Sequence, residues 1–230
     1  MNDKCHALVL AVNDYRENDI MANVLTDDYG FLTIIMKGAK KITSNNRLFP
    51  LNLYELIIDY KDHKTLYQAR QIKILKSFYD EDFVKMAFKN IIIDVCLKSQ
   101  HLENNLYNEV IFCLSKDNFL AYSIFLSHLC RHFGIKPYVD GCVICDDTKV
   151  IALDNRSGGF VCAKHCQTKI GHEVKRLRKF RIINKADYQN YDCLKVDDYD
   201  FDDFKLVLEF FLENSGLQLK SYNFYLKIKQ

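Results

Sequence analysis

The sequence predicts a multidomain α+β protein in which a small β-barrel precedes a helical domain that carries a cysteine-rich insert. Three observations lead to this prediction. Short β-prone segments fill roughly the first 75 residues, apolar residues then recur at helical spacing from residue 80, and two close cysteine pairs lie between residues 142 and 166. We therefore expect a barrel domain at 1–79 and a helical domain at 80–230 that includes a metal-binding segment at 138–170.

The composition is that of an ordinary globular protein, with 230 residues, 49% hydrophobic residues and 27% charged residues. The net charge of +2 means that a nucleic-acid surface must come from local clustering of basic residues. The nine cysteines are an odd number, and the N-terminus has no apolar leader. No apolar run approaches the roughly 18 residues of a membrane helix. We expect a cytoplasmic protein without a membrane segment.

Five β-prone segments are expected in the barrel domain: Cys5–Val12, Ile20–Thr26, Phe31–Lys37, Leu51–Tyr60 and Thr65–Leu75. Asp28-Tyr29-Gly30 forms a hairpin-type turn between the second and the third. Segments of this length and spacing predict a small closed or partly open barrel, such as an OB-fold. Periodicity alone leaves an SH3-like barrel as the alternative.

A polar stretch, residues 38–47, separates the third and fourth segments. It contains Lys40, Lys41 and Arg47, has no acidic residue, and follows Lys37 directly. Many basic loops are only solvated. At the rim of an OB-type barrel, however, such a loop lies where these folds bind nucleic-acid strands, so it is a candidate phosphate-contacting surface.

Capping residues in the sequence indicate where helices of the helical domain begin. Asp80 or Asp82 is expected to cap one helix, and Asn118 is expected to cap another that stops near Gly134. The acidic residues between 197 and 203 precede an apolar stretch, 204–212, so they suit the N-terminus of a further helix.

Two cysteine pairs predict the metal site. Cys142 and Cys145 are separated by sixteen residues from a second pair, Cys162 and Cys166. The insert carries a turn signal between two β-prone runs, which is typical of a zinc ribbon. Four soft ligands would close a tetrahedron around one structural Zn²⁺ ion and leave no open position. Because the second pair has three intervening residues, we expect Cys166 as the fourth ligand and keep His165 as the alternative.

The densest basic cluster, Lys175–Arg181, is followed by an acidic cluster at Asp197–Asp203. Two interpretations stay open: the clusters pair with each other, or the basic one contacts phosphates through Arg176, Arg178 and Lys179. The chain lacks a Gly-rich phosphate loop, a nucleophile elbow and any catalytic acidic cluster. We therefore expect no enzyme activity.

Several segments, taken in order, carry a family resemblance. They are Leu8-Val9-Leu10, Tyr15-Arg16-Glu17-Asn18-Asp19-Ile20, Leu25-Thr26 with Gly30, Lys37-Gly38-Ala39-Lys40-Lys41, Leu48-Phe49-Pro50-Leu51, Phe133-Gly134-Ile135-Lys136-Pro137, Gly158-Gly159-Phe160-Val161-Cys162 and Leu219-Lys220-Ser221. Their order and spacing resemble RecO, a family of bacterial recombination mediators. The spacing of the second cysteine pair departs from the family pattern, which more often has two intervening residues.

The resemblance implies an N-terminal OB-fold and a helical domain that carries the ribbon. It also implies binding of single- and double-stranded DNA, annealing of complementary strands, and work with RecR to load RecA onto strands covered by single-strand-binding protein. Arg16 joins Lys37, Lys40, Lys41 and Arg47 as a candidate DNA contact. Arg176, Arg178 and Lys179, or Arg131, are candidates to receive the acidic tail of single-strand-binding protein. Such a protein would act in the cytoplasm, associated with the nucleoid.

Two alternatives from other classes remain. A thiol or zinc enzyme would need a redox-labile cysteine pair or an open zinc position. A zinc-bearing OB module for RNA would prefer RNA to a matched DNA strand at one salt concentration.

Overall fold

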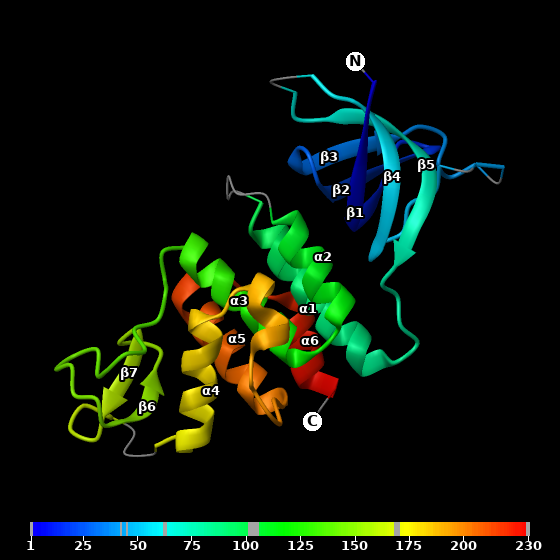
Figure 1. Cartoon of the computed structure of the whole chain (residues 1–230). Coiled ribbons are helices and arrows are strands. Elements are labelled where there is room, and N and C mark those ends of the chain that lie inside the picture. The colour runs from blue at the N-terminus through cyan, green and yellow to red at the C-terminus, as the bar shows by residue number, and fades with distance from the viewer. Residues whose placement is uncertain are drawn as a thin grey trace. The chain divides into compact units, whose positions relative to one another are not determined.

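The computed structural model (Figure 1) describes residues 2–41, 43–44, 46–61, 64–100, 106–167 and 171–228. The chain divides into two compact units, residues 1–115 with 219–230 and residues 116–218. We describe each unit by itself, and the predicted domain boundary after residue 79 stays a prediction. No helix among the described residues is both long and apolar enough to cross a membrane.

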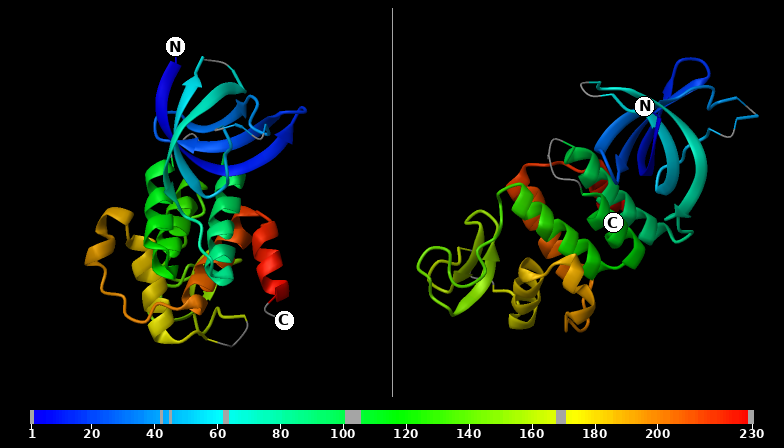
Figure 2. Two further views of the ribbon diagram at one scale, coloured as in Figure 1. Left: turned by 90° about the vertical axis from the view of Figure 1, so that its right-hand side faces the viewer. Right: turned by 45° about the horizontal axis from the view of Figure 1, so that its top comes forward.

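The first unit begins with a closed five-stranded barrel (Figures 1 and 2). Its strands are β1 (Asn2–Tyr15), β2 (Asp19–Thr26), β3 (Gly30–Met36), β4 (Asn52–Asp59) and β5 (Tyr67–Ser77), in the spatial order β1-β2-β3-β5-β4. All neighbours are antiparallel except β3 and β5, whose short parallel pairing closes the barrel. This arrangement confirms the predicted OB-type barrel.

Alternation of side chains builds the barrel core. Ala22 and Val24 of β2 face Ile34 and Met36 of β3 inside the barrel, and all four are fully buried. Their neighbours in sequence point outward, because successive side chains of a strand lie on opposite faces. The β2–β3 hairpin turns at Gly30, whose φ of 64° favours glycine.

Three helices complete the first unit: α1 (Phe83–Lys98), α2 (Tyr107–Lys116) and α6 (Lys220–Ile228). Asp82 caps α1, since its carboxylate accepts hydrogen bonds from the N–H groups of the first turn. Asp94 of α1 accepts hydrogen bonds from the N–H and the hydroxyl of Ser221, at 3.2 and 2.9 Å. This carboxylate therefore caps the last helix from its neighbour.

The second unit contains α3 (Phe119–His132), α4 (Val174–Lys185), a 3-10 turn η1 (Tyr188–Cys193) and α5 (Phe201–Ser215). The Asn118 side chain caps α3, and Asp200 forms a capping box with Asp203 at the start of α5, as the sequence predicts. Aromatic rings join the helices: Phe180 of α4 meets Phe210 of α5 at a centroid distance of 6.0 Å.

The cysteine-rich insert is a hairpin of β6 (Val150–Asp154) and β7 (Gly159–Cys162) in the second unit. Tyr138 adds a short parallel bridge to Gly159, with backbone hydrogen bonds of 3.0 and 2.9 Å on either side. A Cβ at position 159 would lie 2.4 Å from the Tyr138 carbonyl oxygen, so only glycine allows this approach. The insert is thus a small ribbon with a third backbone segment fixed against it.

Candidate metal centre and nucleic-acid surfaces

Cys142, Cys145, Cys162 and His165 form a compact group that could hold zinc, called the metal cluster below. Their ligand atoms all lie within 4.8 Å of one another. Two tight turns supply them. In the first, the Asp146 N–H donates to the Cys142 carbonyl at 2.8 Å; in the second, the His165 N–H donates to the Cys162 carbonyl at 3.1 Å.

The distances within the metal cluster fit a tetrahedral zinc site. The sulfur atoms of Cys145 and Cys162 are 3.8 Å apart. The His165 Nδ1 atom lies 3.4 Å from the Cys142 sulfur and 3.5 Å from the Cys162 sulfur. A tetrahedron with Zn–S of about 2.3 Å and Zn–N of about 2.0–2.1 Å has edges of about 3.8 Å between sulfurs and about 3.5 Å between sulfur and nitrogen. Three of the six distances between the donor atoms therefore match the edges of a tetrahedral zinc site.

The surroundings of Cys142 favour its thiolate. Desolvation acts to raise the pKa of this thiol, but hydrogen bonds from backbone N–H groups of both turns and from His165 outweigh it and lower the pKa to about 6. A thiolate is the form that binds a metal ion, so the turns prepare this ligand.

Of the predicted ligands, the structure brings Cys142, Cys145 and Cys162 together with His165, the alternative fourth ligand. Cys166 is outside this group. It is buried in the small apolar core of the ribbon, where it packs with Ala152 and Val161. The choice between Cys166 and His165 as the fourth ligand stays a prediction.

The predicted barrel surface consists of Arg16, Lys37, Lys40, Lys41 and Arg47, called the basic rim below. The loop that carries most of it projects from the barrel in Figure 1; its residues 42 and 45 lie outside the described part of the chain. The loop is attached to the β1–β2 turn, because Lys40 donates through its backbone N–H to the Asn18 carbonyl and through its ammonium group to the Arg16 carbonyl, at 3.0 and 2.9 Å. Arg16 therefore lies beside the loop, although the two are far apart in sequence.

The members of the basic rim differ in what their side chains do. Lys37 and Lys41 are exposed, and their ammonium groups have no ion pair within the described residues. Lys40 is engaged with the Arg16 carbonyl and with Asp14 at 3.4 Å. The Arg47 guanidinium donates to the Lys41 carbonyl at 3.4 Å. Lys37 and Lys41 are thus the cations best placed to meet a phosphate.

An uncharged strip runs across the outer face of β2 and β3. Met21 pairs with Ile35 and Asn23 pairs with Thr33, and all four side chains are half-buried. The Thr33 hydroxyl donates to the Asn23 amide oxygen at 3.2 Å. Apolar and neutral hydrogen-bonding groups of this kind suit nucleobases, whereas the basic rim suits phosphates.

The second predicted basic surface is largely paired inside its own unit. Arg176 lies 3.1 Å from Asp203 and 3.2 Å from Asp200, and Lys179 lies 2.6 Å from Asp203. Arg178, by contrast, points outward and is exposed. Arg131 donates to the carbonyls of Asn184 and Ala186 at the end of α4. Intramolecular pairing, one of the two interpretations, therefore accounts for Arg176 and Lys179.

Comparisons with known proteins show which proteins the chain is similar to. The family model "Recombination protein O N terminal" matches residues 1–78. The chain is 23% identical to DNA repair protein RecO of Enterococcus faecalis, over 94% of this chain and 89% of that protein. It is 25% identical to DNA repair protein RecO of Bacillus cereus and of Bacillus anthracis, over 97% of this chain and 96% of each relative. The chain is thus similar to RecO proteins over nearly its whole length, and the family match itself covers its first third.

These matches confirm the resemblance to RecO that the sequence carries, and the family model covers the whole barrel. The structure adds functional candidates that sequence reasoning missed. The uncharged strip on β2 and β3 was detectable as the outward residues of two alternating strands. Tyr138 was not singled out, although an exposed aromatic residue beside a zinc-ribbon motif is a usable signal.

The first testable outcome concerns the fourth ligand. Replacing His165 by alanine is expected to release the metal, because it removes one of the four clustered donors. Cys166→Ala is the matched control and is expected to keep the metal. Metal content by mass spectrometry, on purified folded protein, decides between them. If Cys166→Ala loses the metal and His165→Ala keeps it, Cys166 is the fourth ligand.

The second outcome concerns pH. Desolvation acts to raise the pKa of Asp200. The hydrogen bond from the Asp203 N–H and the charge of Arg176 outweigh it and hold this pKa below its ordinary value of about 4. As pH falls below about 4, the unfolded state therefore takes up this proton first, and the stability from the charge is lost. Because the pair is half-exposed, the loss is expected to be about 1 kcal/mol or less.

Asp200→Asn isolates this charge, since asparagine also caps helices well. Denaturant unfolding of the wild type and Asp200→Asn at pH 7 and at pH 3 gives the comparison. The wild type is expected to be the more stable at pH 7, with the gap closing at pH 3. A gap that is equal at both pH values would contradict the assignment.

Proposed function

We propose that this protein is a non-enzymatic mediator of recombinational DNA repair that binds single- and double-stranded DNA at the basic rim and anneals complementary strands. The observation that carries the proposal is the likeness to DNA repair RecO proteins over nearly the whole chain, together with an OB-type barrel that carries a basic rim. With RecR, the protein would help to load RecA onto strands covered by single-strand-binding protein. It would act in the cytoplasm at the nucleoid.

In this mechanism the exposed ammonium groups of Lys37 and Lys41, with Arg16 and Arg47, contact phosphates of one strand. Such contacts release counterions and are independent of sequence, as a general repair factor requires. The uncharged strip on β2 and β3 then faces the bases. Lys40 acts mainly by holding the loop to the β1–β2 turn.

We also propose that the metal cluster binds one structural zinc ion through Cys142, Cys145, Cys162 and His165. Four protein ligands leave no open coordination position, so the ion would supply folding energy to the ribbon and no Lewis-acid chemistry. The fit of the donor distances to a tetrahedron supports this assignment.

The test of the mediator function is annealing of two complementary oligonucleotides, each coated with the cognate single-strand-binding protein. The wild type is expected to accelerate annealing, and the effect should fall with salt. The triple variant Lys37→Ala, Lys41→Ala, Arg47→Ala is expected to lose the acceleration and to bind single-stranded DNA with a salt slope smaller by about 2, since each phosphate contact contributes about 0.7.

The matched control removes three exposed lysines of the same unit, in Lys85→Ala, Lys98→Ala and Lys227→Ala, so the change in net charge is equal. It should anneal like the wild type. Folded, metal-loaded wild type that gives no acceleration at any salt concentration would refute the proposal. Tighter binding of a matched RNA strand than of DNA would instead favour the RNA-module alternative.

For the acidic tail of single-strand-binding protein we propose a groove between α1 and α6, because Arg176, Lys179 and Arg131 are engaged elsewhere. The groove has a volume of about 340 Å³ and is lined by apolar and basic side chains, among them Phe83, Phe224 and Lys220. Phe83 and Phe224 are more than half exposed. An exposed apolar groove beside a lysine suits a short acidic segment that also carries apolar residues.

Fluorescence polarisation with a labelled tail peptide tests this site. Phe224→Ala and Lys220→Ala are each expected to weaken binding about tenfold, which corresponds to about 1.4 kcal/mol. Arg178→Ala is the control on the other unit and should leave the affinity unchanged. If Arg178→Ala weakens binding and Phe224→Ala does not, the tail binds at α4.

A further inference from the structure

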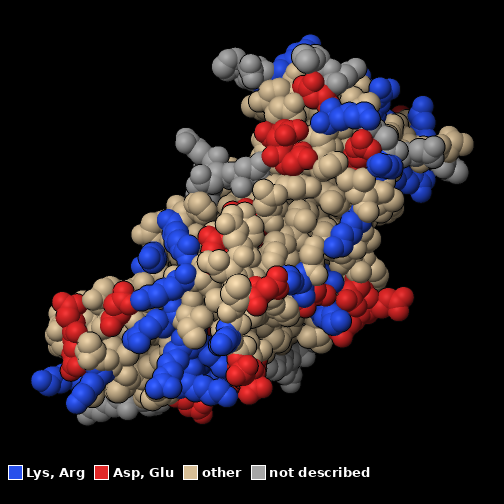
Figure 3. Space-filling model, viewed as in Figure 1, with Lys and Arg blue, Asp and Glu red and all other residues tan. Residues whose placement is uncertain are grey.

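Helix periodicity divides the basic run of α4 between two faces. Arg176 and Lys179 turn inward to the acidic residues at the start of α5. Arg178 and Lys185, seven residues apart and so about 10.5 Å along the same helix face, turn outward and are exposed. Ile182 lies between them with 37% of its surface exposed. Figure 3 shows Lys and Arg side chains gathered on the surface over α4.

The end of this outer face, at Lys185, borders a recess, called the ribbon recess below. Its volume is about 210 Å³, and residues 136–140 and Lys185 line it. Lys136 and Lys185 supply cations, and Asp140 makes an ion pair with Lys185. The volume is below the roughly 300–1,000 Å³ of sites for whole small molecules, so one base or one phosphate is the appropriate size of ligand.

Tyr138 presents a fixed aromatic ring at the recess. Its backbone is bonded on both sides to the β6–β7 hairpin, through the contact that Gly159 permits. Its hydroxyl donates to the Asp146 carboxylate at 2.9 Å, while 39% of the residue remains exposed. A partly exposed aromatic side chain that is fixed at its backbone and at its hydroxyl suits stacking on a base, because its side-chain entropy is already reduced.

We infer that the ribbon recess is a second binding site for a single nucleic-acid strand, in which Tyr138 stacks on one base while Lys136, Arg178 and Lys185 contact neighbouring phosphates. An aromatic face interleaved with cations is the combination by which proteins hold unpaired strands. This inference rests on the proposed function only for the identity of the ligand, a nucleic-acid strand. It lies in the second unit, whereas the basic rim belongs to the first.

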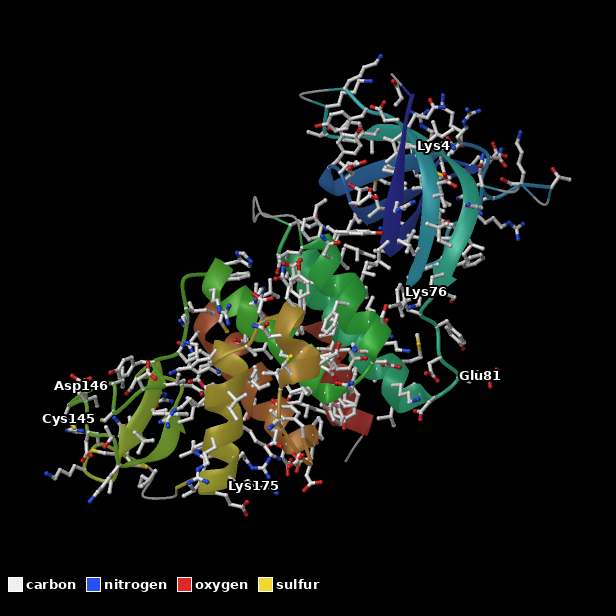
Figure 4. All side chains as sticks on the ribbon, viewed as in Figure 1. Lys4, Lys76, Glu81, Cys145, Asp146 and Lys175 are labelled. Carbon is white, nitrogen blue, oxygen red and sulfur yellow. The ribbon has the colours of Figure 1, made fainter. Side chains whose placement is uncertain are left out.

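A hydrogen bond and one turn of the chain link the recess to the metal cluster. Asp146, which holds the Tyr138 hydroxyl, follows Cys145 directly, and Figure 4 shows the two residues together at the tip of the ribbon. The Asp146 backbone is in the left-handed region at φ 58° and donates its N–H to the Cys142 carbonyl. Loss of the metal would loosen this turn and release the ring, so strand binding at the recess is expected to depend on the metal.

The experiment uses the full chain carrying the three rim substitutions Lys37→Ala, Lys41→Ala and Arg47→Ala, so that the remaining binding reports the second unit. The probe is a single-stranded DNA oligonucleotide containing 2-aminopurine, whose fluorescence falls when the base stacks. Quenching is expected, and Tyr138→Leu should abolish it and weaken binding roughly 5- to 10-fold. Tyr138→Phe should retain quenching, because it keeps the ring.

The variant Lys136→Ala, Lys185→Ala is expected to weaken binding and to lower the salt slope by about 1.4. The variant Lys195→Ala, Lys205→Ala, which removes one exposed and one half-buried lysine of the same unit, is the charge control and should have no effect. Removing the metal from the folded chain that carries the rim substitutions should reduce quenching as Tyr138→Leu does. Unchanged binding in Tyr138→Leu and in the double-lysine variant would refute the recess; the rim and the proposed function would stand if the rim substitutions alone abolish binding.

Discussion

The buried carboxylate of Asp203 is the group on which the organisation of the second unit depends. Only 3% of this residue is exposed, so its charge is removed from water and requires partners. Arg176 at 3.1 Å and Lys179 at 2.6 Å supply them, and Asp203 also closes the capping box of α5. Removing both cations would leave a buried charge uncompensated, which typically costs about 3–5 kcal/mol.

That pairing fixes the rotation of α4 about its own axis. With Arg176 and Lys179 directed to α5, the helical period of 3.6 residues places Arg178 and Lys185 on the opposite, outward face. Arg181 completes the arrangement, since it donates to the Val139 carbonyl at 2.7 Å and so attaches residues 136–140 to α4. Lys185, which lines the ribbon recess with Tyr138, is thus directed outward by the ion pairs on the other side of the helix.

The parts of the fold that were predictable are those with local signals. The five strands alternate inside and outside residues, and the starts of α1, α3 and α5 have capping side chains, so each could be recognised from a few neighbouring residues. Helix α4 was not predicted, because its charged residues hide the apolar positions Leu177, Phe180 and Ile183. Which of its cations are inward depends on Asp203, more than twenty residues later.

In the candidate sites, too, only the features with a local sequence signal were predictable. The cysteine spacing identified three donors, but His165 and Cys166 both have N–H groups bonded to the Cys162 carbonyl, and only the path of that turn places the imidazole beside the sulfurs. In the basic rim, the sequence shows which residues are charged but not which of them are bonded within the protein and which are exposed. Lys40 turns back to the Arg16 carbonyl, a contact across 24 positions, whereas Lys41 stays exposed.

Two strand sites of moderate strength suit annealing better than one strong site. A protein that held one strand tightly by its bases would compete with base pairing, whereas contacts to phosphates leave the bases accessible. In the proposed mechanism the basic rim would neutralise backbone charge, and the ribbon recess would hold a strand through one stacked base. Because both proposed sites belong to one chain, a strand bound at one would meet a strand at the other at an effective concentration set by the chain that links them and not by the bulk solution. Weak, reversible contacts then suffice to bring two strands together and still release the duplex.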